Sequence, residues 1–289
     1  MKTILAATDF STRSDRALRR AAMLARGAGA RLVLAHAVDS DRPPALVESE
    51  RRAASDLLGD LALTLRTSDG VAAEAQVVLG DPFEGILEAS AAEGADLVVV
   101  GAHRRQILRD IFVGTTVERI IRRSRCPVLM VNAMPARPYR QGLIATDLSA
   151  GAAAALEAAR RLELVPAEAT TVLHFYDDAI IGAGRTFAAA KRFEARAAEE
   201  RPRAQAALAR FLGEHGAGAG RTILRPLEGP MAQAICDAAR EIDADLIAVG
   251  TRGQGGLTKV LTGSVTLDLL RIAERDVLAV PLPDAPNGA

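Results

Sequence analysis

The chain has 289 residues, about two domains of typical size, and its 36 basic and 36 acidic side chains leave a formal net charge of zero. This balance excludes a general nucleic-acid binder, which normally carries a basic excess. No apolar run approaches the ~20 residues of a membrane span, and Asp9 interrupts the first apolar stretch too early for a signal peptide. We therefore expect a cytoplasmic protein with neither a nucleic-acid nor a membrane partner.

The first half of the chain alternates short apolar runs with helical patterns. Runs rich in β-branched residues predict strands buried on both faces of a parallel sheet, over Ile4–Thr8, Leu32–Val38, Ala75–Leu79, Leu97–Gly101 and Val128–Val131. Helical spacing of apolar residues predicts helices over Ser11–Ala28, Ala45–Arg66, Pro82–Glu93 and Thr115–Arg123. Ser11 suits an N-cap, and Pro82 suits a first helical turn.

The stretch Asn132–Gln141, with its two prolines, is predicted to be an interdomain linker. The pattern then repeats, with strands predicted over Leu143–Thr146, Thr171–Phe175, Thr222–Arg225, Leu246–Val249 and Val277–Val280. This alternation predicts an α/β fold of two tandem doubly wound domains, each a five-stranded parallel sheet of order 3-2-1-4-5 with helices on both faces. We expect the first domain over residues 1–134 and the second over residues 140–289.

The second half is a copy of the first. Ile4–Ser11 returns as Gly142–Ser149, and the strand that carries His36 returns at the same spacing with His174. The glycine loops further along return at a longer spacing, so the second half holds extra residues, which we place in Asp177–Pro202. A repeat this long indicates tandem domains and not a solenoid of short repeats.

A glycine-marked frame follows the fourth predicted strand of the second half: Gly250-Thr-Arg-Gly253, nine further residues, and Gly263-Ser264. A bare glycine lets backbone amides approach an anion, and Gly263-Ser264 opens a predicted helix whose positive end would face that anion. Asp147 ends the first strand of this half, so its carboxylate would lie across the crevice and accept from ribose hydroxyls. The frame predicts a nucleotide site, although no P-loop sequence occurs in the chain.

The first half carries the same frame in altered form. Gly101 and Gly114-Thr115 keep their places, but Arg104 stands where the second half has Gly253. A long side chain there would block the approach of backbone to phosphate, so the frame is intact only in the second half. The run His103-Arg104-Arg105 could form an anion site of a different shape or a solvated loop, and both interpretations stay open.

The segments Ile4–Ser11, Asp245–Gly253 and Leu261–Val265 resemble the universal stress protein family, and the similarity covers both halves. The G-x2-G-x9-G-[ST] pattern is that of the family's ATP-binding branch, so the resemblance implies a tandem-domain member that binds ATP with Mg2+. It implies nucleoside contacts from Ala145, Thr146, Asp147 and the backbone of Phe175, and phosphate contacts from Gly250, Arg252, Gly253, Gly263, Ser264 and Val265. The corresponding residues of the first half are Asp9, Ala37, Gly101, Gly114 and Thr115, and Arg104 puts ATP binding there in doubt.

Several other residues fit plain structural roles. His36 and His174 occupy equivalent strand ends without a recurring acidic or cysteine partner, which favours structural histidines over a metal ligand or a general base. Arg192–Arg203 is dense in both charges and is predicted to be an exposed helix face. The two cysteines, Cys126 and Cys236, are far apart and lack metal-ligand spacing, which favours a reduced chain.

We therefore expect an adenine-nucleotide-binding stress-response protein that regulates rather than catalyses, with at most slow ATP hydrolysis, because no nucleophile–base pair stands out. The alternative is an interaction or small-ligand scaffold whose first domain binds something other than ATP. An adenylating or pyrophosphatase-type enzyme would need a Ser-Gly-Gly-x-Asp-Ser-like loop, where this chain has Asp9-Phe-Ser11 and Asp147-Leu-Ser149. Pairing of Val128–Val131 with Val277–Val280 would make the domains an intramolecular pseudo-dimer, and a homodimer is also open.

Overall fold

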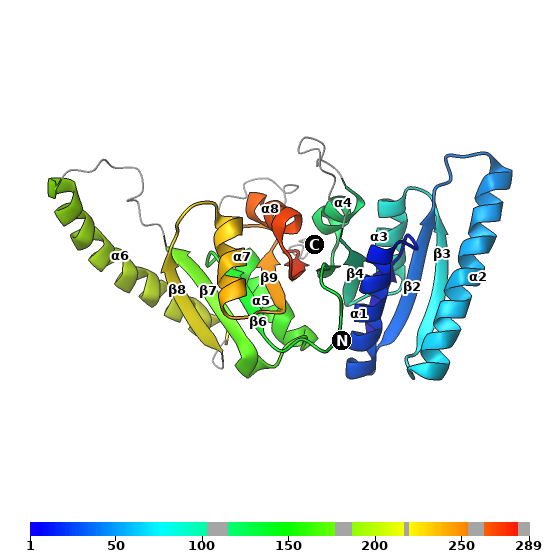
Figure 1. The fold of residues 1–289 in the computed structure, drawn as a ribbon, viewed down its shortest axis with the longest axis horizontal. Helices are drawn as coiled ribbons and strands as arrows, with labels where there is room; N and C mark the ends of the chain where they lie inside the picture. Colours follow the sequence, from blue (N-terminus) through cyan, green and yellow to red (C-terminus); the bar gives the residue numbers. More distant parts are fainter. Residues whose placement is uncertain (103–114, 177–186, 217–219, 254–262, 283–289) are drawn as a thin grey trace, which may run out of the picture.

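The computed structural model describes residues 1–102, 115–176, 187–216, 220–253 and 263–282; over 187–199 it describes the helix but not the side chains. The strands form a ten-stranded sheet in the order β3-β2-β1-β4-β5-β10-β9-β6-β7-β8. Figure 1 shows this sheet along the long axis of the molecule, with the first half on the right and the second on the left. Across the described ranges, no helix is both long and apolar enough to cross a membrane.

The elements of the first half lie close to their predicted bounds. They are β1 (Thr3–Ala7), α1 (Thr12–Ala28), β2 (Arg31–Val38), α2 (Pro44–Ser68), β3 (Ala73–Leu79), α3 (Pro82–Ala92), β4 (Leu97–Gly101), α4 (Thr116–Arg123) and β5 (Val128–Val131). Ser11 is the N-cap of α1, because its hydroxyl accepts from the backbone N–H of Ser14 at 3.3 Å. Pro82 occupies the first turn of α3, as predicted.

The second half repeats this order. Its elements are β6 (Gly142–Thr146), α5 (Ala150–Leu162), the 3-10 turn η1 (Ala167–Ala169), β7 (Thr170–Tyr176), α6 (Phe187–Glu214), β8 (Arg221–Pro226), α7 (Met231–Glu241), β9 (Leu246–Gly250), α8 (Ser264–Ile272) and β10 (Asp276–Val280). The stretch predicted to hold extra residues falls in the β7–β8 connection, and its part before Phe187 lies outside the described residues. Of the predicted charged face Arg192–Arg203, the side chains of residues 192–199 lie outside the described residues, and Arg201 and Arg203 are exposed on α6.

Both halves have the predicted strand order. β1 lies between β2 and β4, β6 lies between β7 and β9, and all of these neighbours are parallel. The strand order β3-β2-β1-β4-β5 of the first half is therefore matched by the order β8-β7-β6-β9-β10 of the second, which confirms a doubly wound α/β fold in each half. The predicted domain limits at residues 134 and 140 fall within the connection between β5 and β6 and stay a prediction.

The two parallel sheets join through β5 and β10. These strands pair antiparallel, with Val277 opposite Met130 and Leu278 opposite Leu129, and all four side chains are fully buried. The pairing removes two sheet edges that would otherwise expose unpaired backbone groups. The predicted pairing of the end strands is confirmed, and the halves form an intramolecular pair.

Each face of the sheet carries one hydrophobic core that runs through both halves. The helices α1, α2, α5 and α6 cover one face, where Leu129 and Leu278 belong to the same cluster. The helices α3, α4, α7 and α8 cover the other face, where Met130 and Val277 share a second cluster. Because both cores cross the β5–β10 junction, the two halves are packed as one body.

The connection between β5 and β6 carries a buried network that the sequence did not predict. The carboxylate of Asp276, fully buried at the start of β10, accepts from the Tyr139 hydroxyl at 2.5 Å and from the backbone N–H groups of Asn132 and Ala133 at 2.9 Å. Arg20 of α1 pairs with this carboxylate at 3.3 Å and lies over the Tyr139 ring, 4.0 Å from its centroid. Burial and the nearby Asp276 charge raise the pKa of the Tyr139 phenol, which therefore remains a donor.

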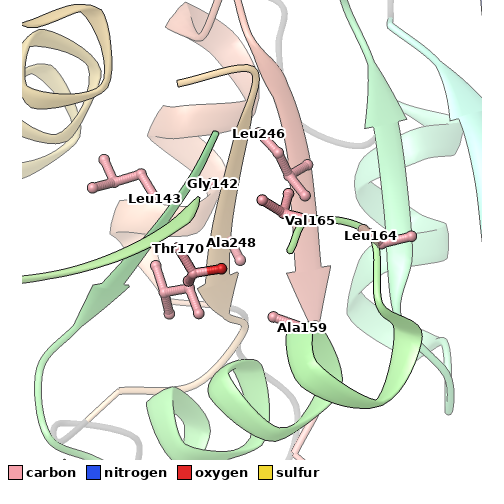
Figure 2. A pocket seen from close by; sticks show the side chains of 9 residues that line it. Gly142, Leu143, Ala159, Leu164, Val165, Thr170, Leu246 and Ala248 are labelled. Atoms are coloured by element: carbon pink, nitrogen blue, oxygen red, sulfur yellow. The ribbon is translucent and has the colours of Figure 1, made fainter. Parts of the chain in front are cut away.

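A small cavity of about 20 Å³ lies beside the start of β6. Figure 2 shows it between side chains of β6, β9 and the loop that follows α5. Gly142 and Ala248 line it, at positions where the first half has the larger residues Ile4 and Val99. It lies toward the amino ends of β6 and β9, away from Asp147, and is therefore not part of the predicted nucleotide crevice.

Candidate functional site

The residues predicted to hold a nucleotide meet at the carboxyl ends of neighbouring strands. β6 pairs with β9, so Asp147, which follows β6, lies beside the loop that follows β9. β7 pairs with β6 on the other side and places Phe175 near its carboxyl end. The strand order reverses at β6, because the chain continues to β7 on one side of it and to β9 on the other. In open parallel sheets, ligands bind beyond the carboxyl ends of the strands at such a reversal.

The turn that carries Asp147 is held by its own side chains. The hydroxyl of Thr146 accepts from the backbone N–H of Leu148 at 3.0 Å, and the Asp147 carboxylate accepts from that of Ser149 at 3.1 Å. Leu148 has a φ of 63°, a left-handed conformation that a branched residue rarely adopts. Ser149 then caps α5 by accepting from the backbone N–H of Ala152 at 3.2 Å. These bonds therefore fix the Asp147 turn at the carboxyl end of β6.

The first half repeats this turn. Thr8 accepts from the backbone N–H of Phe10, and Asp9 accepts from that of Ser11, both at 3.0 Å. Phe10 has a φ of 58°, close to that of Leu148. The two copies therefore share the backbone turn that presents the aspartate, and they differ in Ser14, whose hydroxyl accepts from Thr8 at 3.0 Å where the second half has Ala152.

The loop after β9 leads the chain back to the same strand end. The backbone N–H of Thr251 donates to Val280 at 2.8 Å, and the carbonyl of Thr251 accepts from the N–H of Gly263 at 2.7 Å. The hydroxyl of Thr266 donates to the carbonyl of Gly250 at 2.9 Å. These bonds hold the N-terminus of α8 against the end of β9. Thr251 and Thr266 were not among the predicted site residues, because neither belongs to the glycine pattern.

Gly250 also makes a close backbone contact that the glycine pattern did not predict. A Cβ on Gly250 would collide with the backbone of Gly151 in the first turn of α5, and a Cβ on Gly151 would collide with the carbonyl of Arg252. The loop and the helix thus touch backbone to backbone, with no Cβ on either side of the contact. Gly151 was not among the predicted site residues. The first half has Arg13 at the equivalent position, and this difference between the copies was a usable signal.

Replacing a glycine inside a helix by alanine usually stabilises a protein, but this crossing predicts the opposite at Gly151. Gly151→Ala should destabilise the protein by about 1–3 kcal/mol, because backbone cannot move aside as a side chain can. The matched control is Gly59→Ala in α2, where a Cβ would have no neighbour within 4 Å. This substitution should stabilise the protein by about 0.5–1 kcal/mol. Urea unfolding measures both, and equal stability of the two variants would contradict the close crossing.

Gly253 lies directly against Asp147. A Cβ on Gly253 would be 2.6 Å from Oδ2 of the Asp147 carboxylate, so any side chain there must displace that group. The Ser149 hydroxyl also approaches the carbonyl of Arg252 at 3.5 Å. The turn after β6 and the loop after β9 therefore form one continuous wall. His103, Arg104, Arg105 and Gly114 of the first-half loop lie outside the described residues.

The helices that follow the two loops begin differently. In the first half the Thr115 hydroxyl caps α4 by accepting from the backbone N–H of Glu118 at 3.2 Å, and Glu118 places an acid in the first turn. In the second half Gly263 is the N-cap residue of α8, which has no side-chain cap and no acid in its first turn among the described residues. The N-terminus of α4 therefore has a side-chain cap and an acidic residue within the chain, whereas the described residues give α8 neither.

The remaining predicted residues have mainly apolar surroundings. Ala145, Phe175 and Val265 are partly buried and pack against the core on the α7–α8 side of the sheet. Ser264 is exposed at the first position of α8. In the first half, Ala37 near the end of β2 is partly buried and Gly101 contacts the backbone of α1, where a Cβ would be 2.8 Å from Arg13. Their contacts with a ligand stay predictions.

Comparison with known proteins bears on the whole chain. A sequence model of the universal stress protein family matches residues 1–132 and 138–281. The universal stress protein of the QAH/OAS sulfhydrylase 3′ region of Thermus aquaticus is 34% identical over 139 residues, which are 45% of this chain and 98% of that protein.

Solved structures match the fold over the full length. A universal stress protein from Archaeoglobus fulgidus has a TM-score of 0.73 at 19% identity, covering 97% of this chain and 98% of that one. A functionally unknown protein from Pseudomonas aeruginosa has a TM-score of 0.66 at 23% identity, covering 98% and 93%. The two family matches and the duplicated fold make this chain a tandem two-domain member of the universal stress protein family.

Proposed function

We propose that the protein binds an adenine nucleotide, ATP with Mg2+, at the strand ends of its second half, and acts as a regulatory binding protein of the stress response. The observation that supports this most is the N-terminus of α8. It has no side-chain cap within the described chain, and the bond from Gly263 to Thr251 holds it beside the wall formed by Asp147 and Gly253.

The phosphates would lie at the start of α8. Backbone N–H groups of a helix's first turn lack partners within the helix, and the helix dipole adds positive potential there. The exposed Ser264 hydroxyl is a further donor, and Arg252 brings a positive charge to the same wall. Mg2+ would bridge phosphate oxygens, since it is usually held by substrate phosphates together with few protein ligands.

The nucleoside would lie toward β6 and β7. The Asp147 carboxylate uses Oδ1 to hold its turn, and its Oδ2 faces Gly253 at the crevice, in position to accept from a ribose hydroxyl. The end of β7 at Phe175 would supply backbone groups to the adenine. This division follows the geometry of doubly wound sheets, in which the base and the phosphates straddle the strand-order switch.

The first half would not bind ATP in the same way. Its helix α4 already has a Thr115 cap and the Glu118 acid in the first turn, and a negative charge there opposes a second anion. The Glu118 carboxylate is almost fully buried and lies 3.6 Å from Arg271 of α8. The first half is therefore better suited to packing against the second, or to a ligand other than ATP.

A matched pair of substitutions tests the location of the site. Asp147→Asn should weaken ATP binding about five- to tenfold, since a neutral acceptor replaces a charged one while the turn is kept. Asp9→Asn makes the same change in the same turn of the first half and should leave the affinity unaltered. Equilibrium dialysis with ATP and Mg2+ measures both. A loss in Asp9→Asn alone would move the site to the first half.

A further inference from the structure

One side chain outside the glycine pattern reaches the turn that carries Asp147. His174 of β7 contacts the carbonyl oxygen of Thr146 through Nδ1 at 2.8 Å. A carbonyl oxygen only accepts, so Nδ1 must carry the proton and donate. Thr146 is the last residue of β6 and immediately precedes Asp147, so this bond fixes the point at which the chain leaves the sheet.

The turn needs such an external support. Leu148 is held at a positive φ, and conformations of this kind persist only where surrounding contacts over-determine them. The bonds from Leu148 to Thr146 and from Ser149 to Asp147 are internal to the turn and could move with it. The bond from His174 comes from a different strand and ties the turn to the sheet.

The same bond also links the two strand ends that would hold the nucleoside. Thr146 and His174 are partners in the β6–β7 register, and Phe175 follows His174 directly. Loss of the bond would therefore disturb the position of the Asp147 carboxylate relative to the backbone at Phe175. The phosphate end of the crevice, at α8, would be little affected.

We propose that His174 is a positioning residue for the nucleoside end of the site, an inference that rests on the proposed nucleotide binding. It orients the Asp147 turn against the end of β7 and makes no contact with the ligand itself. The first half contains the same device, because Nδ1 of His36 contacts the carbonyl of Thr8 at the same 2.8 Å. His36 therefore provides a control with the same hydrogen bond, in a half that we expect not to bind ATP; its ring also packs against Phe10, with the two ring centroids 4.5 Å apart.

The test compares three variants by calorimetry with ATP and with ADP, each with Mg2+. His174→Ala should weaken the binding of ATP and of ADP by the same factor, about fivefold, because one neutral hydrogen bond is lost. The factor is the same because the affected contacts are those of the nucleoside, which both nucleotides share. His174→Asn should recover most of the affinity, since Nδ2 of asparagine is as many bonds from Cα as Nδ1 of histidine. His36→Ala should lower the melting temperature at least as much, because the ring contact with Phe10 is also lost, yet leave the affinity unaltered.

The outcomes separate this inference from the proposed function. A wild-type protein that binds neither nucleotide would overturn the proposed function itself. If the wild type binds, the positioning role is overturned by wild-type affinity in His174→Ala, or by an equal loss in His36→Ala. Failure of His174→Asn to recover affinity while it restores the melting temperature would also overturn it.

Discussion

Replacing Asp276 by alanine is expected to lower the free energy of unfolding by about 3–5 kcal/mol, a large part of the stability of most proteins. The change would leave the Arg20 guanidinium buried without its carboxylate, and would remove the acceptor of the Tyr139 hydroxyl and of two linker N–H groups. An uncompensated buried charge and unpaired buried donors are among the most destabilising changes known. Urea unfolding followed by circular dichroism measures the loss.

A surface carboxylate provides the control for this result. Asp237→Ala in α7 removes an exposed partner of Arg240 at 2.9 Å and should cost less than about 1 kcal/mol. Tyr139→Phe removes only the hydroxyl from the buried network and should cost about 1–2 kcal/mol. If Asp276→Ala were no more destabilising than Asp237→Ala, the network would not be what ties the linker to the two halves.

Gly253→Arg is expected to weaken ATP binding by roughly ten- to a hundredfold, from the loss of charge-assisted contacts worth ~1.5–3 kcal/mol. A side chain at 253 must displace the Asp147 carboxylate, whose Oδ2 would be 2.6 Å from the new Cβ. The guanidinium could then pair with that carboxylate and withdraw it from the ribose. Gly253 does not have a positive φ, so arginine suits the backbone and the melting temperature should change little.

The reciprocal substitution is the natural control. Arg104→Gly restores the glycine pattern in the first half and should do no harm to ATP binding by the second. It need not create a new site, because Thr115 and Glu118 still occupy the start of α4. Unchanged affinity in Gly253→Arg would show that the intact glycine frame is not the nucleotide site, and the scaffold interpretation would then be preferred.

The fold was largely predictable because its signals are local. Continuous β-branched runs such as Val128–Val131 mark strands buried on both faces, and Ser11 and Pro82 mark helix starts. The duplication strengthened these predictions, since an element predicted in one half could be compared with the equivalent residues of the other half. The pairing of β5 with β10 was one of two open possibilities, and its antiparallel direction came only from the structure.

The missing parts depend on contacts between residues far apart in the sequence. Asp276 looks like an ordinary polar residue before a strand, and only the fold brings Arg20 and Tyr139 to it. Gly151 is one small residue in an alanine-rich helix until the loop at Arg252 is seen to cross it. The pattern singled out Gly250 for a phosphate contact, which stays a prediction, and it did not show that the lack of a side chain there also accommodates the backbone of Gly151.

The central claim is that the chain has one nucleotide site, in its second half. Isothermal titration calorimetry of the purified full-length protein with ATP and Mg2+ tests it most directly, because the stoichiometry counts the sites. One ATP per chain, lost or strongly weakened in Gly253→Arg and retained in Arg104→Gly, is the predicted result. Two equivalent sites per chain, or no heat of binding from a protein freed of bound nucleotide, would contradict it.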